Sequence, residues 1–226
     1  MTARVSDFES QEYWEHRYSN PELSRGTYFD WYLISYSVIR PFLLEALLSC
    51  KECCVGGCWK MMDVGCGNSS LLRDMYEDKQ SLDAALCRPT RLALVGVDYS
   101  EVVVSQQRNL VHLYDADAAT VSYAVVNLLS SIGHPCVCAD VAVAVDKATL
   151  DCIDCTGKEE DVLAAIGFVH ACLVPAGVWL LVTCRATERR VGQLEKCGLF
   201  AVEGTHSLQN DPISPAHLIV ARKIIG

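Results

Sequence analysis

From Trp59 onward, short runs of consecutive apolar residues alternate with longer segments in which apolar residues recur every three or four positions. An apolar run of about four to eight residues has the length of a buried strand, whereas the recurring pattern is typical of an amphipathic helix. The runs predict strands at 59–65, 91–98, 121–127, 141–147 and 177–183. The helical pattern predicts helices at 68–86, 100–114, 159–173 and 188–197, with Ser100 capping the second and Pro175-Ala176-Gly177 closing the third.

Two further strands are predicted at the C-terminal end, at 199–208 and 216–224, with a proline-containing turn and no helix between them. Such a pair forms an antiparallel hairpin, which we place at one edge of the sheet. The earlier strands alternate with helices and are apolar almost throughout, so they form a parallel sheet covered on both faces. The sequence therefore predicts an α/β fold with an antiparallel C-terminal hairpin.

The first 50 residues are rich in aromatic side chains and form a different region. Ser6-x-x-Glu9 has the spacing of a capping box that opens a helix through Tyr18, which Asn20-Pro21 would end. A second helical pattern covers 31–50, and Pro41 within it allows either one kinked helix or two helices. We predict a single domain in which a helical extension, 1–57, precedes a core at 58–226.

Composition and charge narrow the classes of protein. The 226 residues are 51% hydrophobic and 21% charged, so the chain can bury a large core. A net charge of −9 argues against a protein that binds nucleic acid through phosphates and is compatible with a basic partner. The N-terminus has no signal-peptide or transit-peptide pattern, and no apolar stretch is long enough to span a membrane. A soluble cytoplasmic protein is expected.

Thirteen cysteines are irregularly spaced, which is typical of reduced thiols rather than a disulfide framework. The groups Cys50-x-x-Cys53-Cys54-x-x-x-Cys58 and Cys152-x-x-Cys155 could form a zinc site, but no histidine lies close to either group in the sequence. We predict no metal, and we interpret Cys66 as a tolerated small residue rather than a nucleophile.

A glycine loop, Asp63-Val64-Gly65-Cys66-Gly67-Asn68-Ser69, follows the first predicted strand. Glycines there let the backbone turn tightly and approach a ligand at the carboxyl end of a parallel sheet. The loop lacks the third glycine of a dinucleotide-binding fingerprint, because Ser70 stands in its place, and no phosphate-binding lysine follows. Such a loop alone is a weak signal, since many strand-to-helix turns carry glycines for steric reasons.

An acid at the end of the second strand, Asp98, strengthens the signal. A carboxylate at this position can accept hydrogen bonds from both hydroxyls of a ribose, and Tyr99 beside it can pack on an adenine. The alternative is a helix-capping Asp98 and a core Tyr99. Because the loop and the acid both lie at strand ends, a nucleoside site is the better interpretation.

Several ordered motifs resemble those of the seven-strand S-adenosylmethionine-dependent methyltransferases. They are D-V-G-C-G-N-S at 63–69, V-D-Y-S at 97–100 and V-D-K-A-T-L-D at 145–151. The N-terminal segments Tyr13-Trp14-Glu15-His16-Arg17-Tyr18, Phe29-Asp30-Trp31-Tyr32 and Arg40-Pro41 narrow the resemblance to the branch that contains lysine methyltransferases of elongation factor 1-alpha. The motifs cover roughly residues 10 to 155.

The resemblance implies a Rossmann-like seven-strand fold with S-adenosyl-L-methionine as cofactor and S-adenosyl-L-homocysteine as product. Asp63, Gly65 and Gly67 would belong to the cofactor loop, with Gly65 at the methionine part. Asp98 would hold the ribose, while Tyr99, Asn127 and Leu128 would surround the adenine. Lys147 would line the pocket close to the cofactor. Trp14, Tyr18 and Trp31 would form an aromatic lid, which suits a cationic sulfonium, although these rings could equally pack the extension onto the sheet.

The resemblance also implies a protein substrate, a basic protein such as elongation factor 1-alpha, methylated on a lysine. A lysine must be neutral to attack, so the site should desolvate it or accept its proton. Asp146 and Asp151 are the candidates for orienting the acceptor amine. Lys147 is a poorer general base because it would first have to lose its own proton.

Two departures from the family pattern bear on the substrate. Asn127 stands where the family commonly has Asp, and Ala148 replaces the glycine of D-K-G-T-L-D. Three alternatives therefore stay open: a small-molecule methyltransferase, a non-catalytic binding module with the same fold, and a nicotinamide or nucleotide-sugar enzyme on a similar sheet. The missing third glycine and the C-terminal hairpin disfavour the last of these.

Overall fold

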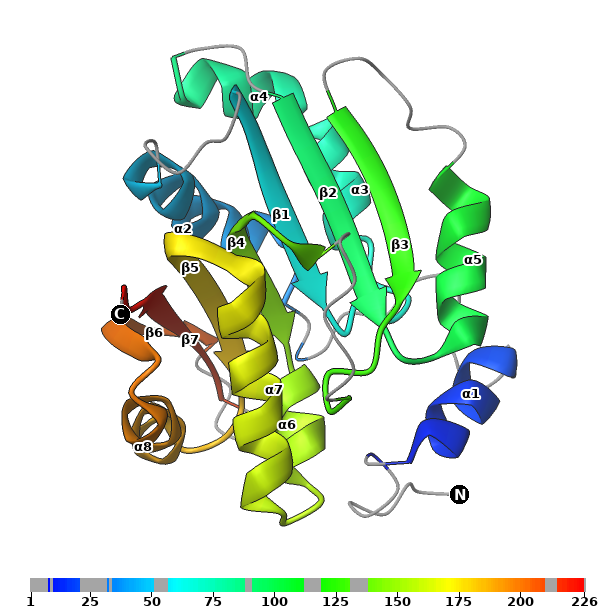
Figure 1. The fold of residues 1–226 in the computed structure, drawn as a ribbon. Helices are drawn as coiled ribbons and strands as arrows, with labels where there is room; N and C mark the ends of the chain where they lie inside the picture. The colour runs from blue at the N-terminus through cyan, green and yellow to red at the C-terminus, as the bar shows by residue number, and fades with distance from the viewer. Residues whose placement is uncertain are drawn as a thin grey trace.

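The computed structural model describes residues 8, 10–20, 32, 34–50, 57–87, 91–111, 119–130, 138–209 and 215–225 (Figure 1). The helices in these ranges are α1 Gln11–Ser19, α2 Tyr36–Ser49, α3 Leu71–Glu77, α4 Lys79–Ala85, α5 Glu101–Val111, α6 Thr149–Asp154, α7 Glu159–Cys172 and α8 Thr187–Cys197. The strands are β1 Cys58–Val64, β2 Arg91–Asp98, β3 Ala119–Val125, β4 Val141–Lys147, β5 Leu173–Thr183, β6 Phe200–Gln209 and β7 Ala216–Lys223.

The strands form one seven-stranded sheet in the order β3-β2-β1-β4-β5-β7-β6. The first five strands in this order are parallel to one another, with Trp59 of β1 opposite Leu92 of β2 and Met61 opposite Val143 of β4. β7 runs antiparallel between β5 and β6. The predicted fold class, including the antiparallel C-terminal hairpin at one edge, is confirmed.

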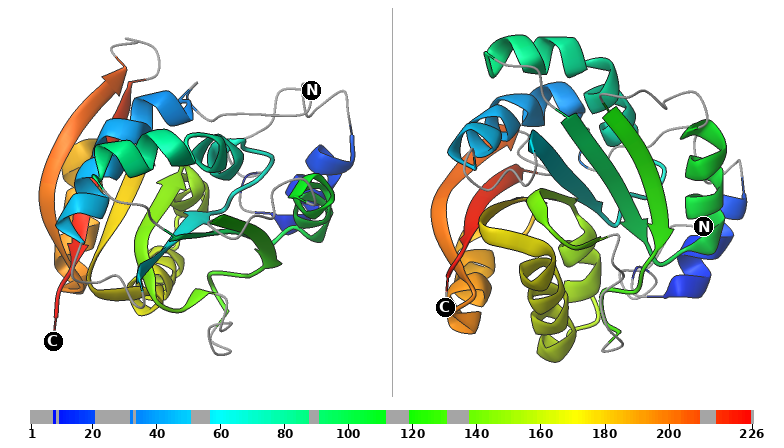
Figure 2. Two further views of the ribbon diagram at one scale, coloured as in Figure 1. Left: turned by 90° about the horizontal axis from the view of Figure 1, so that it is seen from above. Right: turned by 45° about the horizontal axis from the view of Figure 1, so that its top comes forward.

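Helices cover both faces of the sheet (Figures 1 and 2). Alternate residues of each strand point to opposite faces, so Met61 packs with α2, α3 and α5 whereas Met62 packs with α6, α7 and α8. The central strands are apolar on both sides because both faces are covered; β4 is buried at every position. This explains why the sequence shows continuous apolar runs there instead of alternation.

The helix predicted at 68–86 is wrong as a single element, because the chain forms α3 and α4 with a break at Asp78. Asp78 Oδ2 accepts hydrogen bonds from the Tyr36 hydroxyl at 2.7 Å and from Arg40 Nε at 2.6 Å. Both donors lie on α2, so a contact between distant segments fixes the point at which the helix is interrupted. The apolar periodicity of residues 68–86 does not reveal this interruption.

The turn predicted at Pro175-Ala176-Gly177 is also wrong, because helix α7 ends at Cys172 and β5 begins directly at Leu173. The three residues form an irregularity inside β5: the pairing with β4 shifts between Val141 and Val143, and Ala176 has a φ of 59°. Between the pairs formed by Val141 and Val143, β5 has three more residues than β4, and the irregularity accommodates them together with a proline that cannot donate to the ladder. The strand therefore starts four residues earlier than the apolar run at 177–183.

The N-terminal helices differ from the prediction in their limits. α1 begins at Gln11 with Ser10 as its N-cap, whose side chain accepts a hydrogen bond from Tyr13 N, while Ser6 and Glu9 of the predicted capping box lie outside the described residues. α2 is a single helix that includes Pro41. α2 packs on β4, β5 and α3, so within the predicted extension it is α1 that lies at the carboxyl ends of the strands (Figure 1).

In the described part of the chain, every helix is too short or too polar to cross a lipid bilayer.

Candidate functional site

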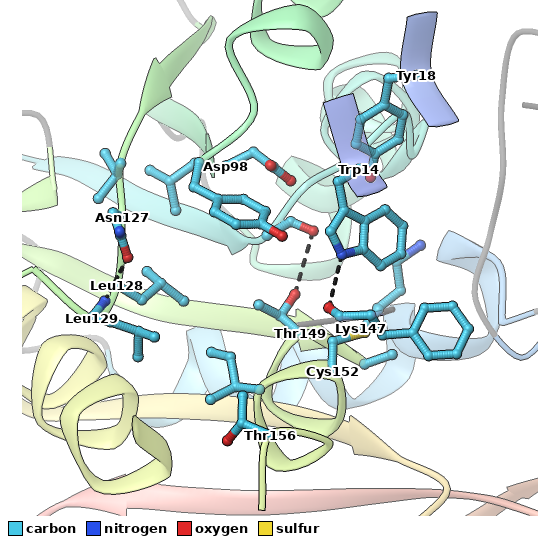
Figure 3. A pocket seen from close by; sticks show the side chains of 17 residues that line it. Trp14, Tyr18, Asp98, Asn127, Leu128, Leu129, Lys147, Thr149, Cys152 and Thr156 are labelled. Atoms are coloured by element: carbon cyan, nitrogen blue, oxygen red, sulfur yellow. Dashed lines mark hydrogen bonds between the residues drawn. The ribbon is translucent and has the colours of Figure 1, made fainter. Parts of the chain in front are cut away.

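A cavity opens at the carboxyl ends of β2, β1 and β4, next to the segment that follows β3 (Figure 3). The strand order reverses between β1 and β4, because β2 and β3 lie on one side of β1 while β4 and β5 lie on its other side. Open α/β sheets bind ligands at such a switch point. The cavity, counted with the solvent at its mouth, has a volume of about 730 Å³. The described residues that line it are Phe8, Trp14, Tyr18, Gly65, Val97, Asp98, Tyr99, Val126, Asn127, Leu128, Leu129, Lys147, Ala148, Thr149, Cys152, Ile153 and Thr156.

The two glycines of the loop lie very close to side chains of other segments, whereas the approach of the loop to a ligand stays a prediction. Gly65 has a φ of 62°, and a Cβ atom placed on it would lie 2.0 Å from Thr149 Oγ1. Gly67 has a φ of 48°, and a Cβ there would lie 2.8 Å from the Tyr18 hydroxyl. Both positions therefore require glycine, for the backbone conformation and for the space. Gly65 lines the cavity, whereas Gly67 faces the lid helix α1.

Side chains from three other elements hold this loop in place. Gln107 of α5 donates from Nε2 to the carbonyl oxygens of Gly67 and Ser69, at 2.9 and 3.0 Å. Lys147 at the end of β4 donates to Ser69 Oγ at 2.9 Å. Asp98 at the end of β2 accepts from Gly67 N at 3.0 Å. A loop fixed this way needs little rearrangement when a ligand binds.

Asp98 is buried and lines the cavity, as the ribose-binding prediction requires. Its Oδ2 accepts from Gly67 N and its Oδ1 accepts from Ser100 N at 2.9 Å. Each carboxylate oxygen can accept a second hydrogen bond from a ligand. Burial raises the pKa of Asp98 to about 6; the two amides oppose the shift and the charge of Glu15 adds to it. The carboxylate is therefore ionised at neutral pH.

The lid aromatics Trp14 and Tyr18 lie one turn apart on α1 and face the cavity (Figure 3). Their rings stack with centroids 5.7 Å apart, and the Trp14 indole donates from Nε1 to the Phe8 carbonyl at 2.9 Å. Arg17 lies over the outer part of the same indole, 5.8 Å from its centroid. Trp31, the third predicted lid residue, lies outside the described residues.

Asn127 and Leu128 lie at another part of the cavity, after β3, with Tyr99 after β2 (Figure 3). Asn127 Oδ1 accepts a hydrogen bond from Leu129 N at 2.9 Å, which forms an Asx turn. This bond orients the side chain so that its amide nitrogen is the donor left for a ligand. Leu128 and Tyr99 supply apolar surface, as expected for the face of a flat base.

The two predicted catalytic carboxylates lie behind the cavity wall. Asp146 is buried and accepts from Thr149 N at 2.8 Å, so it caps α6. Asp151 accepts from the Thr183 hydroxyl at 2.6 Å, Cys184 N at 2.9 Å, Arg190 Nη2 at 2.6 Å and the Tyr32 hydroxyl at 2.8 Å. Among the described residues, neither carboxylate belongs to the lining. Asp63, buried at the end of β1, is likewise outside it.

Ala148, which replaces the glycine of the family motif, has a φ of 76° and is buried against the cavity. Glycine adopts this left-handed conformation freely, whereas alanine adopts it with strain. The left-handed conformation therefore raises the conformational energy of Ala148. Its methyl group occupies space at the cavity that a glycine would leave free.

The thiols near the site are not activated nucleophiles. Burial raises the pKa of Cys66 and of Cys152, and nearby carboxylates raise both further. Both side chains therefore stay protonated at neutral pH. Cys53 and Cys54 of the first cysteine group lie outside the described residues, and within the described ranges no group of three His, Cys, Asp or Glu side chains could hold a metal.

The lining of the described residues combines aromatic and aliphatic surface with one carboxylate, Asp98, and one cation, Lys147. Such a cavity binds and orients a ligand, and the reactive group has to come with the ligand. A nucleoside joined to a zwitterionic amino acid fits this set of groups, because it presents hydroxyls, a flat base and a carboxylate.

Sequence reasoning did not single out Glu15, Thr149, Ile153 or Thr156, and Cys152 was named only as part of a possible zinc site. Thr149 Oγ1 donates to the Val64 carbonyl at 2.8 Å and thereby ties α6 to β1 beside Gly65. Its place in the motif at 145–151 was a signal that could have found it. Glu15 carries no local signal, because its partners lie on α5.

No protein-family model matches the chain. Three curated proteins are similar to it. The methyltransferase srdJ of Neurospora crassa is 28% identical over 82% of this chain and 70% of its own length. The protein-lysine N-methyltransferase efm4 of Schizosaccharomyces pombe is 25% identical over 87% of this chain and 83% of its own. The human mitochondrial citrate synthase-lysine N-methyltransferase is 29% identical over a segment that covers 43% of this chain and 35% of that protein.

Solved structures show the same fold at lower sequence identity. The magnesium protoporphyrin IX methyltransferase of Synechocystis, determined with bound S-adenosylmethionine, has a TM-score of 0.59 at 13% identity and covers 99% of this chain and 100% of its own. An S-adenosylmethionine-dependent methyltransferase of Clostridium acetobutylicum has a TM-score of 0.60 at 11% identity, covering 91% and 96%. The [4+2]-cyclase SpnF has a TM-score of 0.58 at 15% identity, covering 100% and 98%, so the fold does not set the reaction.

Proposed function

We propose that the chain, which has the seven-strand fold of the class I S-adenosylmethionine-dependent methyltransferases, is itself a methyltransferase. In the proposed reaction it transfers a methyl group from S-adenosylmethionine to a lysine side chain of a protein. The named relatives that act on lysine support the choice of acceptor. A basic protein such as a translation elongation factor suits the net charge of −9. A cytoplasmic location stays a prediction.

The observation that carries the proposal is the set of groups that four adjacent strands bring to one cavity. Asn127 and Leu128 follow β3, Asp98 ends β2, Gly65 follows β1 and Lys147 ends β4. In that spatial order they suit the adenine, the ribose, the methionine backbone and its carboxylate. The φ of 62° at Gly65 and the buried Asp98 carboxylate in the lining are features of this chain that fit the cofactor.

When bound, S-adenosylmethionine would supply an electrophilic methyl group on a sulfonium. The chain's own task is to hold the acceptor in line with that methyl group and to exclude water. The Trp14 and Tyr18 rings cover the cavity from α1, and aromatic faces attract a cationic centre. Asp98 would hold the ribose in the middle of the ligand, and Lys147 would pair with the carboxylate at its amino acid end.

The lysine acceptor has to be neutral when it attacks. The aromatic and aliphatic lining disfavours an ammonium group through desolvation, which lowers the pKa of the acceptor amine. The orienting roles of Asp146 and Asp151 stay predictions. Their contacts with Thr149 N and Thr183 support roles that act through the α6 backbone and the end of β5.

The proposal is tested in two steps with the purified full chain. Isothermal titration with S-adenosylmethionine, S-adenosylhomocysteine and NAD establishes the cofactor, and binding of NAD alone would exclude the proposed reaction. Incubation of a cell lysate with methyl-labelled S-adenosylmethionine, followed by peptide mapping of labelled proteins and of purified elongation factor, then identifies the acceptor.

The possible results of the labelling experiment distinguish three functions. Label on a protein lysine supports the proposal. Label confined to small molecules would identify a small-molecule methyltransferase instead. Cofactor binding with no labelled product would indicate a non-catalytic binding module.

Cofactor affinity is expected to fall as the pH is lowered through about 6, because the pKa of Asp98 is raised to about 6. Ribose hydroxyls donate to the ionised carboxylate, so bound cofactor favours the charged form and protonation opposes binding. With this pKa about one tenth of Asp98 is ionised at pH 5, which predicts an affinity for S-adenosylhomocysteine about tenfold lower than at pH 7. Calorimetric titration across this range measures it.

The Asp98→Asn variant is the control for other groups that titrate in the same range. It should bind more weakly at pH 7, by roughly 1–3 kcal/mol for the lost charged hydrogen bonds, and with little dependence on pH. A pH profile in the variant that matches the wild-type profile would show that the carboxylate of Asp98 is not the titrating group.

Replacing Lys147 with methionine is expected to weaken binding of S-adenosylhomocysteine about tenfold or more, because Lys147 is the cation of the described lining. The ligand 5′-methylthioadenosine lacks the amino acid part and therefore the carboxylate. Its affinity should change little in the same variant. Calorimetry with both ligands measures the difference, and an equal loss for both would mean that Lys147 stabilises the loop through Ser69 rather than binding the carboxylate.

A further inference from the structure

Glu15 on α1 accepts three hydrogen bonds from the beginning of α5. Ser100 Oγ donates to it at 2.9 Å, Glu101 N at 3.0 Å and Val102 N at 3.3 Å. The first amides of a helix have no partner within the helix, and the positive end of the helix dipole favours a carboxylate there. Glu15 is therefore a cap of α5, supplied from a helix that lies some 86 residues earlier in the chain.

Two further hydrogen bonds hold α1 in the described structure, and both involve neutral side chains, whereas Glu15 contributes a charged group. Gln11 Nε2 donates to the Tyr99 carbonyl at 3.2 Å, and Gln106 Nε2 of α5 donates to the Tyr18 carbonyl at 3.0 Å. α1 has nine residues and buries Trp14 and Tyr18. So short a helix is not stable alone. Its two buried rings anchor it, and its polar contacts to α5 and Tyr99 set its orientation, because hydrogen bonds are directional whereas apolar burial is not.

We propose that Glu15 is a positioning residue of the cofactor site, which caps α5 and thereby holds α1 so that Trp14 and Tyr18 face the cavity. Trp14 directly precedes Glu15 and Tyr18 follows it by three positions, so the anchor and both rings lie on one short stretch of helix. The inference rests on the proposed function in one respect, that the cavity binds the cofactor.

Glu15 also acts on Asp98 through Ser100. Ser100 donates from its backbone N to Asp98 Oδ1 and from its hydroxyl to Glu15 Oε2, so the two carboxylates share the same helix start. The negative charge of Glu15 raises the pKa of Asp98 in addition to burial. The other described groups that face Asp98 are the phenols of Tyr18 and Tyr99 and the thiol of Cys66, and their own pKa values are raised, so they stay neutral near pH 6.

The test compares Glu15→Ala and Glu15→Gln with Glu12→Gln, which removes the same charge from an exposed position of the same helix. Calorimetry should show S-adenosylhomocysteine bound about tenfold more weakly by Glu15→Ala and about threefold by Glu15→Gln, whose amide oxygen still accepts hydrogen bonds. Glu15→Gln should also move the pH midpoint of binding downward, whereas Glu12→Gln should match wild type in both respects. A merely structural role would not shift that midpoint.

Amide hydrogen exchange on the free protein separates this inference from the proposed function. The amides of 11–19 should exchange faster in Glu15→Ala than in wild type or Glu12→Gln, while the strands keep their protection. Unchanged exchange together with unchanged affinity in both Glu15 variants would overturn the inference. Faster exchange in a protein that binds no S-adenosylhomocysteine would support the docking contact of Glu15 and overturn the proposed cofactor site.

Discussion

Replacing Gly65 with alanine is expected to abolish cofactor binding and to lower the free energy of unfolding by about 2–5 kcal/mol. The added Cβ would lie 2.0 Å from Thr149 Oγ1 and 2.8 Å from Thr149 Cβ, so movement of the hydroxyl alone cannot relieve the clash. Thr149 is also held by its hydrogen bond to the Val64 carbonyl. The backbone of the loop would have to shift, and that loop lines the cavity.

Gly157→Ala is the matched control for this prediction. Gly157 has a φ of 71°, close to that of Gly65, but an added Cβ there would meet nothing within 4 Å. It should cost only the strain of a left-handed alanine, about 1–2 kcal/mol, and leave binding unchanged. Urea unfolding gives the stabilities and calorimetry gives the affinities. If the two variants behaved alike, the close approach of the loop to Thr149 would be refuted.

Replacing Arg190 with methionine is expected to destabilise the protein by about 3–5 kcal/mol. The Arg190 side chain is fully buried and donates from Nη2 to Asp151 Oδ1 at 2.6 Å, with Asp154 Oδ2 at 3.6 Å. Removing the cation leaves a buried carboxylate without its charged partner. Asp151 also binds Thr183, Cys184 N and the Tyr32 hydroxyl, so the disturbance reaches the end of β5 beside the cavity.

Arg189→Met provides the comparison for Arg190→Met. Arg189 is the adjacent residue of α8 and donates to Asp154 Oδ1 at 2.8 Å, but its side chain is 58% exposed. Asp154 is buried but keeps Arg185 and Arg190 as charged neighbours, so removing the exposed arginine should lower the free energy of unfolding, measured in urea, by only about 1 kcal/mol. Equal losses for both arginines would mean that the charge of α8, rather than the buried pair, stabilises this region.

The strands show how much of the fold the sequence could predict. β2 and β4 have the predicted limits, 91–98 and 141–147, because both are buried apolar runs that end at a charged residue. The start of β5 was missed by four residues, since Pro175 and Gly177 resemble a turn and only the pairing with β4 keeps them in the sheet. The helix at 68–86 was predicted as one element because its interruption depends on Tyr36 and Arg40 of α2.

Some residues of the candidate site could likewise be predicted from the sequence, and others could not. The glycine loop and Asp98 could be named from the residues alone, because they stand at the ends of predicted parallel strands, which meet at one edge of the sheet. Asn127, Leu128 and Lys147 were named from the family resemblance, and all three lie in the lining of the cavity. The locations of Asp146 and Asp151 behind the wall could not be predicted. The direction of each side chain depends on its partners: Asp146 of β4 accepts from Thr149 N, and Asp151 of α6 accepts from Arg190.

The sequence by itself determined the class of fold, the glycine loop and the acid that follows the second strand, because strand length, helical periodicity and turn residues are local properties of the chain. The tertiary structure decided which groups act together. Thr149 fills the space opposite Gly65, and Glu15 caps a helix that begins 86 residues after it. Such contacts depend on how distant segments pack in three dimensions, and no local pattern records them.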